Sequence, residues 1–261
     1  MTKTMVKQTF LDKLKAGWNK KKFICVGLDN ADLQFNKTIV DLTFDLVVAY
    51  KPNIAFYEAV ENKGLQTLKE IIDYIREKSP DMPIILDAKR GDIGNTNEAY
   101  VKTIFDNLDV DAVTVHPYLG KESLEPFLKR TDKGIIVLVK TSNKGAGEFQ
   151  DLMVEGKPFY QIVAEHVTKA WNTNGNCAVV VGATYPEELK KVRKIVGDMP
   201  ILVPGIGAQG GDLEATIKNG LNSQKQGLII SSSRGIIFAP NPREATLKLH
   251  QDIVSSLQEA K

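Results

Sequence analysis

Charged residues follow one apolar segment of the chain in a pattern that could do chemistry. Asp87 and Lys89 stand two residues apart, directly after the apolar residues 83–86. In a β-strand, residues two apart point to the same face of the sheet. A charge on such an apolar strand is costly to bury unless an opposite charge pairs with it. The pattern therefore predicts a buried ion pair, either structural or catalytic.

Two other apolar segments carry charges that would suit Asp87 and Lys89. Asp29 ends one of them, and Lys51 lies near the end of the next. If the three segments are neighbouring strands, four charges of alternating sign meet in one place. Such a set can be a structural network, but ionisable groups with perturbed pKa values are concentrated at functional sites. We expect these four residues to form a catalytic centre.

The segments that position these residues belong to a repeated pattern. Eight short runs rich in Val, Ile and Leu are residues 23–29, 47–53, 83–89, 112–117, 134–140, 177–183, 201–207 and 227–234. Each run is apolar almost throughout, which is typical of a strand buried on both faces. Segments with helical periodicity separate the runs. In one of them a single helical face carries Leu65, Leu68, Ile71, Ile72 and Ile75.

Strand then helix, repeated eight times, predicts a parallel α/β sheet. We expect it to close into a (β/α)8 TIM barrel formed as a single catalytic domain by residues 1–261, because no linker interrupts the repeats and the length is typical of this fold. An open, doubly wound sheet is the alternative. Phe10, Leu14 and Trp18, one helical turn apart, predict an extra N-terminal helix. Active sites of TIM barrels lie at the carboxyl ends of the strands, where the four charged residues would lie.

Two motifs late in the chain predict an anion-binding site. The seventh run leads into a glycine-rich loop, residues 204–211, and the eighth ends in SSSRG, residues 231–235. Glycines allow backbone amides to approach an anion closely, and the Arg234 guanidinium offers several donors to phosphate oxygens. TIM barrels often bind phosphate with the loops after strands 7 and 8. We therefore expect a phosphorylated ligand.

Two polar segments allow more than one interpretation. Residues 140–149 follow the fifth run and form either a lid over the site or a solvated connection. Asp92 lies beyond the third run, after a glycine. It is either a site residue or an acid at the start of the next helix, where the helix dipole favours it.

The composition argues against several classes of protein. The net charge is +2 and acids are interleaved with lysines, so we expect no nucleic-acid partner. No apolar stretch approaches the ~20 residues of a membrane helix, and the first ten residues lack the apolar core of a signal peptide. Cys25 and Cys177 lie in apolar runs, where we expect them to pack as small hydrophobes in a reducing cytoplasm. Three scattered histidines argue against a zinc site.

The segment DAKRGDIGNT, residues 87–96, resembles the signature D-x-K-x-x-D-I-x-x-T of orotidine 5'-phosphate decarboxylases, and in its close form their second, mainly bacterial subfamily. The similarity extends to the motifs VGLD, KPN, TSN, PGIGAQGG and SSRG, and covers residues from about 23 to 238. Members often have proline after TSN, where this chain has Lys144. That departure concerns the geometry of the loop after the fifth run.

The resemblance implies decarboxylation of orotidine 5'-monophosphate (OMP) to uridine 5'-monophosphate (UMP), the last step of de novo UMP synthesis, with no metal or other cofactor. Lys89 matches the lysine that protonates C6 of the pyrimidine as carbon dioxide leaves. Asp87 matches the carboxylate that faces the substrate carboxylate, and Lys51 the lysine that holds the aspartate network and touches ribose. The chemistry suits these residues, because a fixed ammonium group stabilises a carbanion at C6 and supplies its proton.

The resemblance also implies substrate contacts and a partner. The contacts are Asp29 (ribose), Ser142 (pyrimidine edge), Gln209 and Arg234 (phosphate), and Pro204 and Gly235 from the same two motifs. Asp92 and Thr96 match residues that reach into the site of a neighbouring subunit. A homodimer with shared sites is therefore expected.

Three other functions stay open. A sugar-phosphate decarboxylase or aldolase-like lyase of the same barrel superfamily would use Mg2+, which Asp87 could bind. A Schiff-base aldolase would use Lys89 or Lys51. A non-catalytic nucleotide-binding protein would keep the barrel without turnover. The full motif through Thr96 favours the decarboxylase.

Overall fold

The computed structural model describes residues 8–207 and 210–259. Within these residues, eight strands form one parallel sheet in the order β2-β1-β10-β9-β8-β5-β4-β3. They are β1 (Ile24–Leu28), β2 (Val47–Pro52), β3 (Ile85–Arg90), β4 (Ala112–Val115), β5 (Gly134–Lys140), β8 (Cys177–Val181), β9 (Ile201–Pro204) and β10 (Leu228–Ser232). Each lies inside one of the apolar runs or overlaps it closely. The predicted strands are therefore confirmed.

The sheet returns on itself where β2 meets β3. Tyr50 bridges to Ile84 and Asn53 to Asp87, both in parallel register, and the Tyr50 amide donates to the Pro83 carbonyl at 3.0 Å. These contacts join the two ends of the strand order. The TIM barrel is thus confirmed, and the open doubly wound sheet is wrong.

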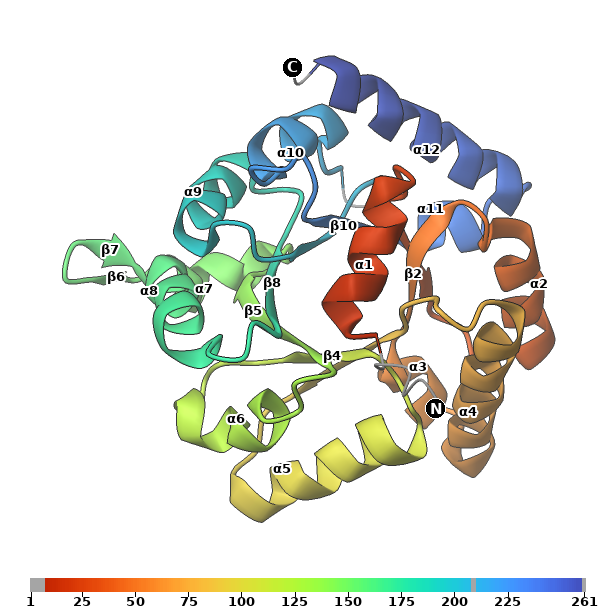
Figure 1. The fold of residues 1–261 in the computed structure, drawn as a ribbon, viewed down its shortest axis with the longest axis horizontal. Helices are drawn as coiled ribbons and strands as arrows, with labels where there is room; N and C mark the ends of the chain where they lie inside the picture. Colours follow the sequence, from red (N-terminus) through yellow and green to blue (C-terminus); the bar gives the residue numbers. More distant parts are fainter. Residues whose placement is uncertain (1–7, 208–209, 260–261) are drawn as a thin grey trace, which may run out of the picture.

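Helices surround the barrel (Figure 1). In the described residues they are α1 (Phe10–Asn19), α2 (Leu33–Thr43), α3 (Ile54–Glu58), α4 (Glu61–Lys78), α5 (Gly94–Val101), α6 (Gly120–Leu128), α7 (Gly147–Gln150), α8 (Phe159–His166), α9 (Pro186–Val196), α10 (Leu213–Gly220), α11 (Arg234–Ile237) and α12 (Pro242–Glu259). Turns of other helical type are η1 (Lys102–Asn107), η2 (Lys144–Ala146) and η3 (Val167–Trp171). The short strands β6 (Met153–Val154) and β7 (Lys157–Pro158) form a hairpin that projects beside α8.

The apolar stripe predicted within α4 is buried except at its beginning. Leu68, Ile71, Ile72 and Ile75 are buried, whereas Leu65 is 46% exposed. Leu65 lies in the first turns of α4, and helices of a βα-barrel begin at the carboxyl end of the sheet. It therefore stands on the rim of the barrel, and the predicted helix is confirmed.

Helix α1 covers the amino-terminal end of the barrel. The Phe10 ring packs against Gly134 at the start of β5, and Trp18 Nε1 donates to the Leu228 carbonyl at the start of β10 at 2.8 Å. Leu14 lies between them and is fully buried. Burial of these side chains contributes roughly 1.5–3 kcal/mol each. The extra N-terminal helix is confirmed.

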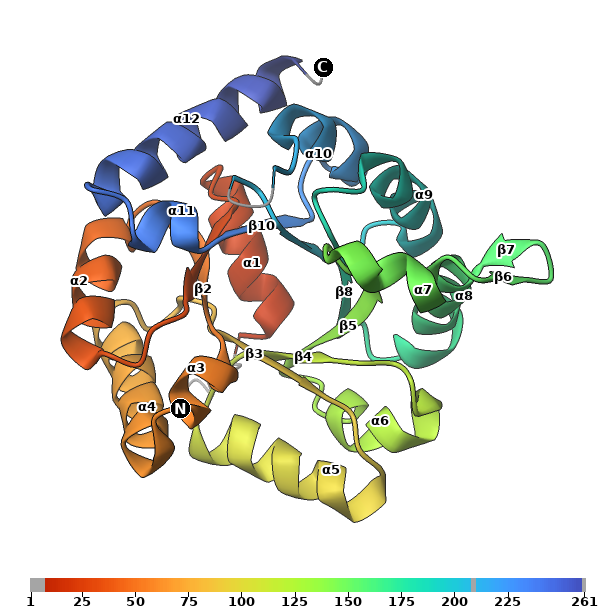
Figure 2. The same ribbon diagram turned by 180° about the vertical axis from the view of Figure 1, so that it is seen from behind.

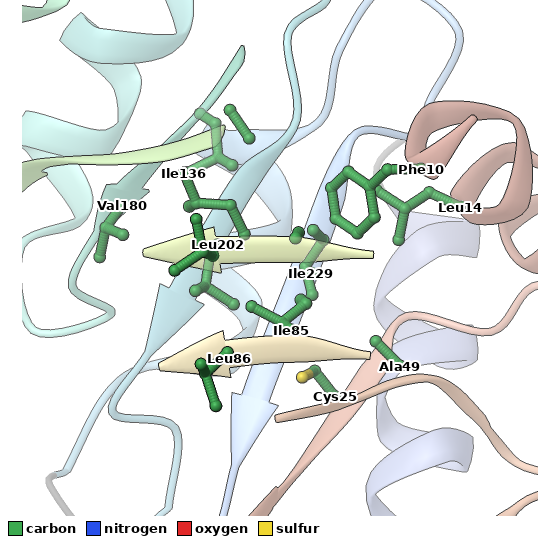
Figure 3. Packing of buried hydrophobic residues seen from close by; sticks show 14 of the residues in the cluster. Phe10, Leu14, Cys25, Ala49, Ile85, Leu86, Ile136, Val180, Leu202 and Ile229 are labelled. Atoms are coloured by element: carbon green, nitrogen blue, oxygen red, sulfur yellow. The ribbon is translucent and has the colours of Figure 1, made fainter. Parts of the chain in front are cut away.

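The interior of the barrel is filled by apolar side chains. Figure 3 shows Ile85, Ile136 and Ile229 packed between the strands, with Phe10 and Leu14 reaching them from α1. Helix α1 and this core fill the amino-terminal end of the barrel, and a larger cavity opens at the carboxyl end. Figure 2 views that opposite end, where α3, α7 and α11 lie.

Both cysteines are free and buried. Burial raises the pKa of each thiol, Cys25 and Cys177, to about 12. Neither is therefore a reactive thiolate at neutral pH. In the part of the chain that the structure describes, no helix has the length and apolarity needed to span a membrane.

Candidate active site

A cavity of about 800 Å³ opens at the carboxyl end of the barrel. Its volume is in the range typical of pockets for small molecules. Of the residues predicted from sequence, those that line it are Asp29, Lys51, Asp87, Lys89, Ser142, Pro204 and Arg234. Leu138, Val180 and Leu202 give it an apolar side. The residues predicted for chemistry and for phosphate binding therefore share one cavity.

Asp87 is the centre of the charged set. Its Oδ1 accepts from Lys89 Nζ at 2.6 Å and from Thr114 Oγ1 at 2.9 Å. Its Oδ2 accepts from Lys51 Nζ at 3.0 Å. The Asp87 and Lys51 side chains are 13% and 8% exposed, whereas that of Lys89 is 51% exposed. Asp87 and Lys51 thus form the buried part of the network, and the Lys89 ammonium group faces the open cavity.

The charges of this network stabilise each other. Burial alone would raise the pKa of the Asp87 carboxyl, but Lys51 and Lys89 hold that pKa well below its ordinary value. Burial alone would lower the pKa of the Lys51 ammonium, but Asp87 and Asp29 raise it above its ordinary value. Both groups are therefore charged at neutral pH.

The backbone of β3 leaves the regular strand geometry at Lys89. Lys89 has φ +48°, which is unfavourable for a residue with a Cβ atom, and the pairing of β3 with β4 shifts between Leu86 and Arg90. Thr114 Oγ1 accepts from the amides of both Ala88 and Lys89 at 3.0 Å. Asp87 and Lys89 do lie together, as predicted, but strand alternation is not the reason. A strained turn fixed by Thr114 places the ammonium group, and strain of this kind is concentrated at functional sites.

Asp29 offers an unused acceptor to the cavity. Its Oδ2 accepts from the Ser233 hydroxyl. Its Oδ1 is buried and has no hydrogen-bond partner within the described residues. A buried acceptor without a partner is costly. Asp29 is thus suited to accept from a hydroxyl group of a ligand.

The phosphate side of the cavity is formed after β9 and β10. Gly205 and Gly207 have φ +104° and +81°, a backbone region that favours glycine. Arg234 begins α11 and is exposed, and its side chain makes no hydrogen bond or ion pair with the other described residues. Its guanidinium group is therefore free for an anion.

Four predicted residues do not line this cavity as the structure describes it. Asp92 is exposed and Thr96 half-buried, both outside the cavity of their own chain. Gly235 adjoins Arg234 but is not part of the lining. Gln209 lies outside the described residues. Their predicted contacts stay predictions.

The structure adds residues that had no predicted role of their own. Thr114, Ser233 and Gln150 line the cavity and bond to predicted site residues or to their loop. Thr114 is a polar residue between two valines of a predicted strand, and Ser233 precedes Arg234 in the predicted SSSRG motif, so both carried a signal. Gln150 lies beyond the polar loop, and nothing in its sequence neighbourhood placed it in the site.

The arrangement of the possible ligand side chains decides whether the cavity could bind a metal ion. In residues 8–207 and 210–259, no three His, Cys, Asp or Glu side chains come together in a way that could hold a metal ion. Asp87, the candidate ligand, already has both carboxylate oxygens bonded to ammonium groups. A cation there would have to displace Lys51 or Lys89.

Residues 22–249 match the model of the orotidine 5'-phosphate decarboxylase / HUMPS family. The chain belongs to this family. Two bacterial relatives carry the name orotidine 5'-phosphate decarboxylase. The protein from Janthinobacterium sp. (strain Marseille) is 49% identical over 246 residues, covering 88% of this chain and 90% of its own. That from Cupriavidus metallidurans is 46% identical over 254 residues, with 92% and 93% covered.

Solved structures of the family share the barrel. UMP synthase from Leishmania donovani superposes with a TM-score of 0.92 at 40% identity, and the match covers 96% of this chain but 57% of that one. OMP decarboxylase from the same organism gives a TM-score of 0.90 at 38% identity, covering 96% and 99%. The resemblance drawn from the motifs is therefore confirmed, and so is the fold that it implied.

Proposed function

We propose that this chain decarboxylates OMP to UMP, the last step of de novo UMP synthesis. The observation that carries the proposal is Lys89, whose ammonium group is half exposed in the cavity yet held 2.6 Å from Asp87. A positioned donor of this kind is what protonation of a carbanion requires. The family membership and the names of the relatives agree with it.

In the proposed reaction the bond between C6 and the carboxylate carbon breaks. Carbon dioxide leaves, and the electron pair stays on C6. Lys89 stabilises this charge as it develops and donates a proton from Nζ to C6, then regains one from solvent. Asp87 faces the departing carboxylate and Lys51 keeps Asp87 charged. The mechanism uses no metal and no other cofactor.

The remaining cavity residues bind the nucleotide. Arg234 takes the phosphate, together with Gln209, Pro204 and Gly235 from the same two loops. The free Oδ1 of Asp29 accepts from a ribose hydroxyl. Ser142 contacts the pyrimidine edge. Binding energy from the phosphate, far from C6, can then be used to position the ring.

Spectrophotometric conversion of OMP to UMP by the purified chain tests this proposal. Activity should survive treatment with EDTA, because Asp87 is neutralised by ammonium groups and needs no cation. Loss of activity on chelation would favour the Mg2+-dependent sugar-phosphate enzyme. Trapping by borohydride with a carbonyl substrate would favour the Schiff-base aldolase, and absence of any turnover would favour a nucleotide-binding protein.

We also propose that the enzyme is a homodimer in which Asp92 and Thr96 complete the partner's site. Asp92 is exposed and does not line its own cavity, and its backbone is fixed by the buried Asn97 side chain, which accepts from its amide at 3.0 Å. Large apolar side chains are exposed on the segments that follow the neighbouring strands β2, β3 and β4. They are Phe56, Val60, Leu65, Ile93, Tyr118 and Leu119. An exposed apolar set of this size is typical of a protein interface.

Mixing two inactive variants tests the shared site. Heterodimers of Lys89→Ala with Asp92→Ala contain one site with both defects and one intact site. Each heterodimer should show up to half of the activity of a wild-type dimer, because one of its two sites is intact. Verified heterodimers that stay inactive would contradict the proposal.

We further propose that residues 1–261 act as one catalytic domain located in the cytoplasm. All strands of the described barrel belong to one sheet, which supports a single domain. Both cysteines are free, as is usual in a reducing compartment. Limited proteolysis and cell fractionation would test the two statements.

A further inference from the structure

Two residues at the end of α7 and just after it hold the loop that carries Ser142 to the end of β5. Lys140, fully buried, pairs with Asp151 at 2.6 Å, and its ammonium group lies 4.5 Å from the centre of the Tyr185 ring. Beside this pair, Gln150 bonds twice to Thr141: its Oε1 accepts from the amide and its Nε2 donates to Oγ1, both at 2.9 Å. These contacts hold the segment in place, and Thr141, Ser142, Asn143 and Gln150 form one wall of the cavity.

The direction of both hydrogen bonds between Gln150 and Thr141 follows from one backbone amide. The Thr141 N–H can only donate, so the Gln150 atom that it meets must be Oε1. Gln150 Nε2 must then donate to Thr141 Oγ1. The Thr141 hydroxyl in turn donates to Asn143 Oδ1 at 2.6 Å, which gives its proton an acceptor. Asn143 Oδ1 is thereby used as an acceptor. Its Nδ2 makes no hydrogen bond with the residues that the structure describes, and Asn143 lines the cavity.

We propose that Gln150 is a positioning residue that selects a uracil-type ring. Acting through Thr141, it makes Asn143 present an NH2 donor to the pyrimidine. A donor there fits the carbonyl oxygen of uracil and opposes the amino group of cytosine. The identity of the ligand rests on the proposed function, whereas the order of the hydrogen bonds rests on the contacts above.

The chain of hydrogen bonds can be reversed by one substitution. In Gln150→Glu both side-chain oxygens only accept. The Thr141 hydroxyl must then donate to residue 150, which leaves its oxygen to accept from Asn143 Nδ2. The Asn143 amide turns over and presents Oδ1. Asn143→Asp reaches the same result directly, since it replaces the free NH2 group by an oxygen and leaves Gln150 in place.

Calorimetric affinities of the full chain for UMP and for cytidine 5'-monophosphate (CMP) test the proposal. Wild-type protein should prefer UMP. Gln150→Glu and Asn143→Asp should each lower the ratio of UMP to CMP affinity roughly tenfold, the size expected from reversing one hydrogen bond. The ratio is the useful quantity, because an added negative charge weakens both nucleotides alike. Glu148→Gln, an exposed change on α7 outside the cavity, should keep the wild-type ratio.

The outcomes separate this proposal from the function itself. An unchanged ratio in the two folded variants, or an equal fall in Glu148→Gln, overturns the role of Gln150. If Gln150→Glu does not fold, an unchanged ratio in Asn143→Asp still overturns the inference, because Gln150 acts only through the donor of Asn143. If the wild-type protein turns over OMP but the variants keep the wild-type ratio of UMP to CMP affinity, only this inference falls. If it binds UMP selectively but does not turn over OMP, only the proposed reaction falls. Wild-type protein that binds UMP and CMP equally also overturns the inference.

Discussion

The molecule contains two networks with the same charge pattern at opposite ends of the barrel. At the carboxyl end, Asp87 lies between Lys51 and Lys89. At the amino end, Asp111 lies between Lys13 and Arg76, at 2.7 and 2.6 Å. Both aspartate side chains are largely buried, at 13% and 8% exposure. A buried acid between two cations is therefore not by itself the mark of an active site.

The surroundings of the two networks differ. Asp111 also accepts from the Ile84 amide at 2.8 Å, and Arg76 donates to the Met82 and Asp109 carbonyls. Backbone groups thus surround this network, which lies beneath α1. The Asp87 network opens onto the cavity, with half of the Lys89 side chain exposed. We infer that the first network stabilises the fold and that the second does chemistry.

The largest expected effect is that of Lys89→Ala. It removes the proposed proton donor, so kcat should fall on the order of 10⁴-fold or more. Binding of UMP should survive within about tenfold, because one charged contact of several is lost. Lys13→Ala removes the equivalent cation of the other network and should keep wild-type kcat. Steady-state kinetics and calorimetry on both variants measure the difference, and an active Lys89→Ala enzyme would contradict the assignment.

Asp111→Asn should act on stability. It leaves Lys13 and Arg76 without their buried acid, which costs about 3 kcal/mol or more. Urea denaturation measures the free energy of unfolding. A loss below about 0.5 kcal/mol, the usual effect of a surface change, would show that the amino-terminal network is not structural.

Arg234→Ala should weaken the binding of OMP. Loss of a charge-assisted hydrogen bond to phosphate corresponds to a KM raised roughly 10–100-fold, with kcat changed much less. Arg243→Ala is the matched control, because Arg243 is an exposed arginine that pairs with Asp45. A fall in kcat at constant KM would move Arg234 out of the phosphate site.

The smallest expected effect is a change of stability with pH. Because the pKa of Asp87 is held below its ordinary value, the stabilisation is complete above about pH 5 and is lost as the pH falls below the unfolded value of about 3.9. In that range the unfolded chain binds the proton and the folded chain does not. The difference in unfolding free energy between wild type and Asp87→Asn should therefore be constant from pH 5 to neutral and shift against wild type in acid. A difference independent of pH down to about pH 3 would contradict the paired state of Asp87.

Most of the fold could be predicted because buried parallel strands are apolar throughout. The eight runs and the helix carrying Phe10, Leu14 and Trp18 need no tertiary information to be found. Leu65 is exposed although it shares the apolar face of α4, because periodicity defines the face of a helix but does not say where the neighbouring elements end.

The site could be predicted only where its residues stand at strand ends. Asp29, Lys51 and Asp87 followed from that rule. The turn at Lys89 did not, because its cause is Thr114 on the next strand, a contact that strand alternation does not contain. Gln150 reaches the site through a bend in the chain after β5, and local composition does not encode such a bend.

The most direct test of the account is the rate of OMP decarboxylation by Asp87→Asn beside that by Asp111→Asn. The two substitutions make the same isosteric change at the acid of each network. We predict wild-type kcat for Asp111→Asn below its melting temperature, and a kcat reduced on the order of 10²-fold or more for Asp87→Asn. Equal rates for the two folded variants would contradict the claim that the open network is the catalytic one.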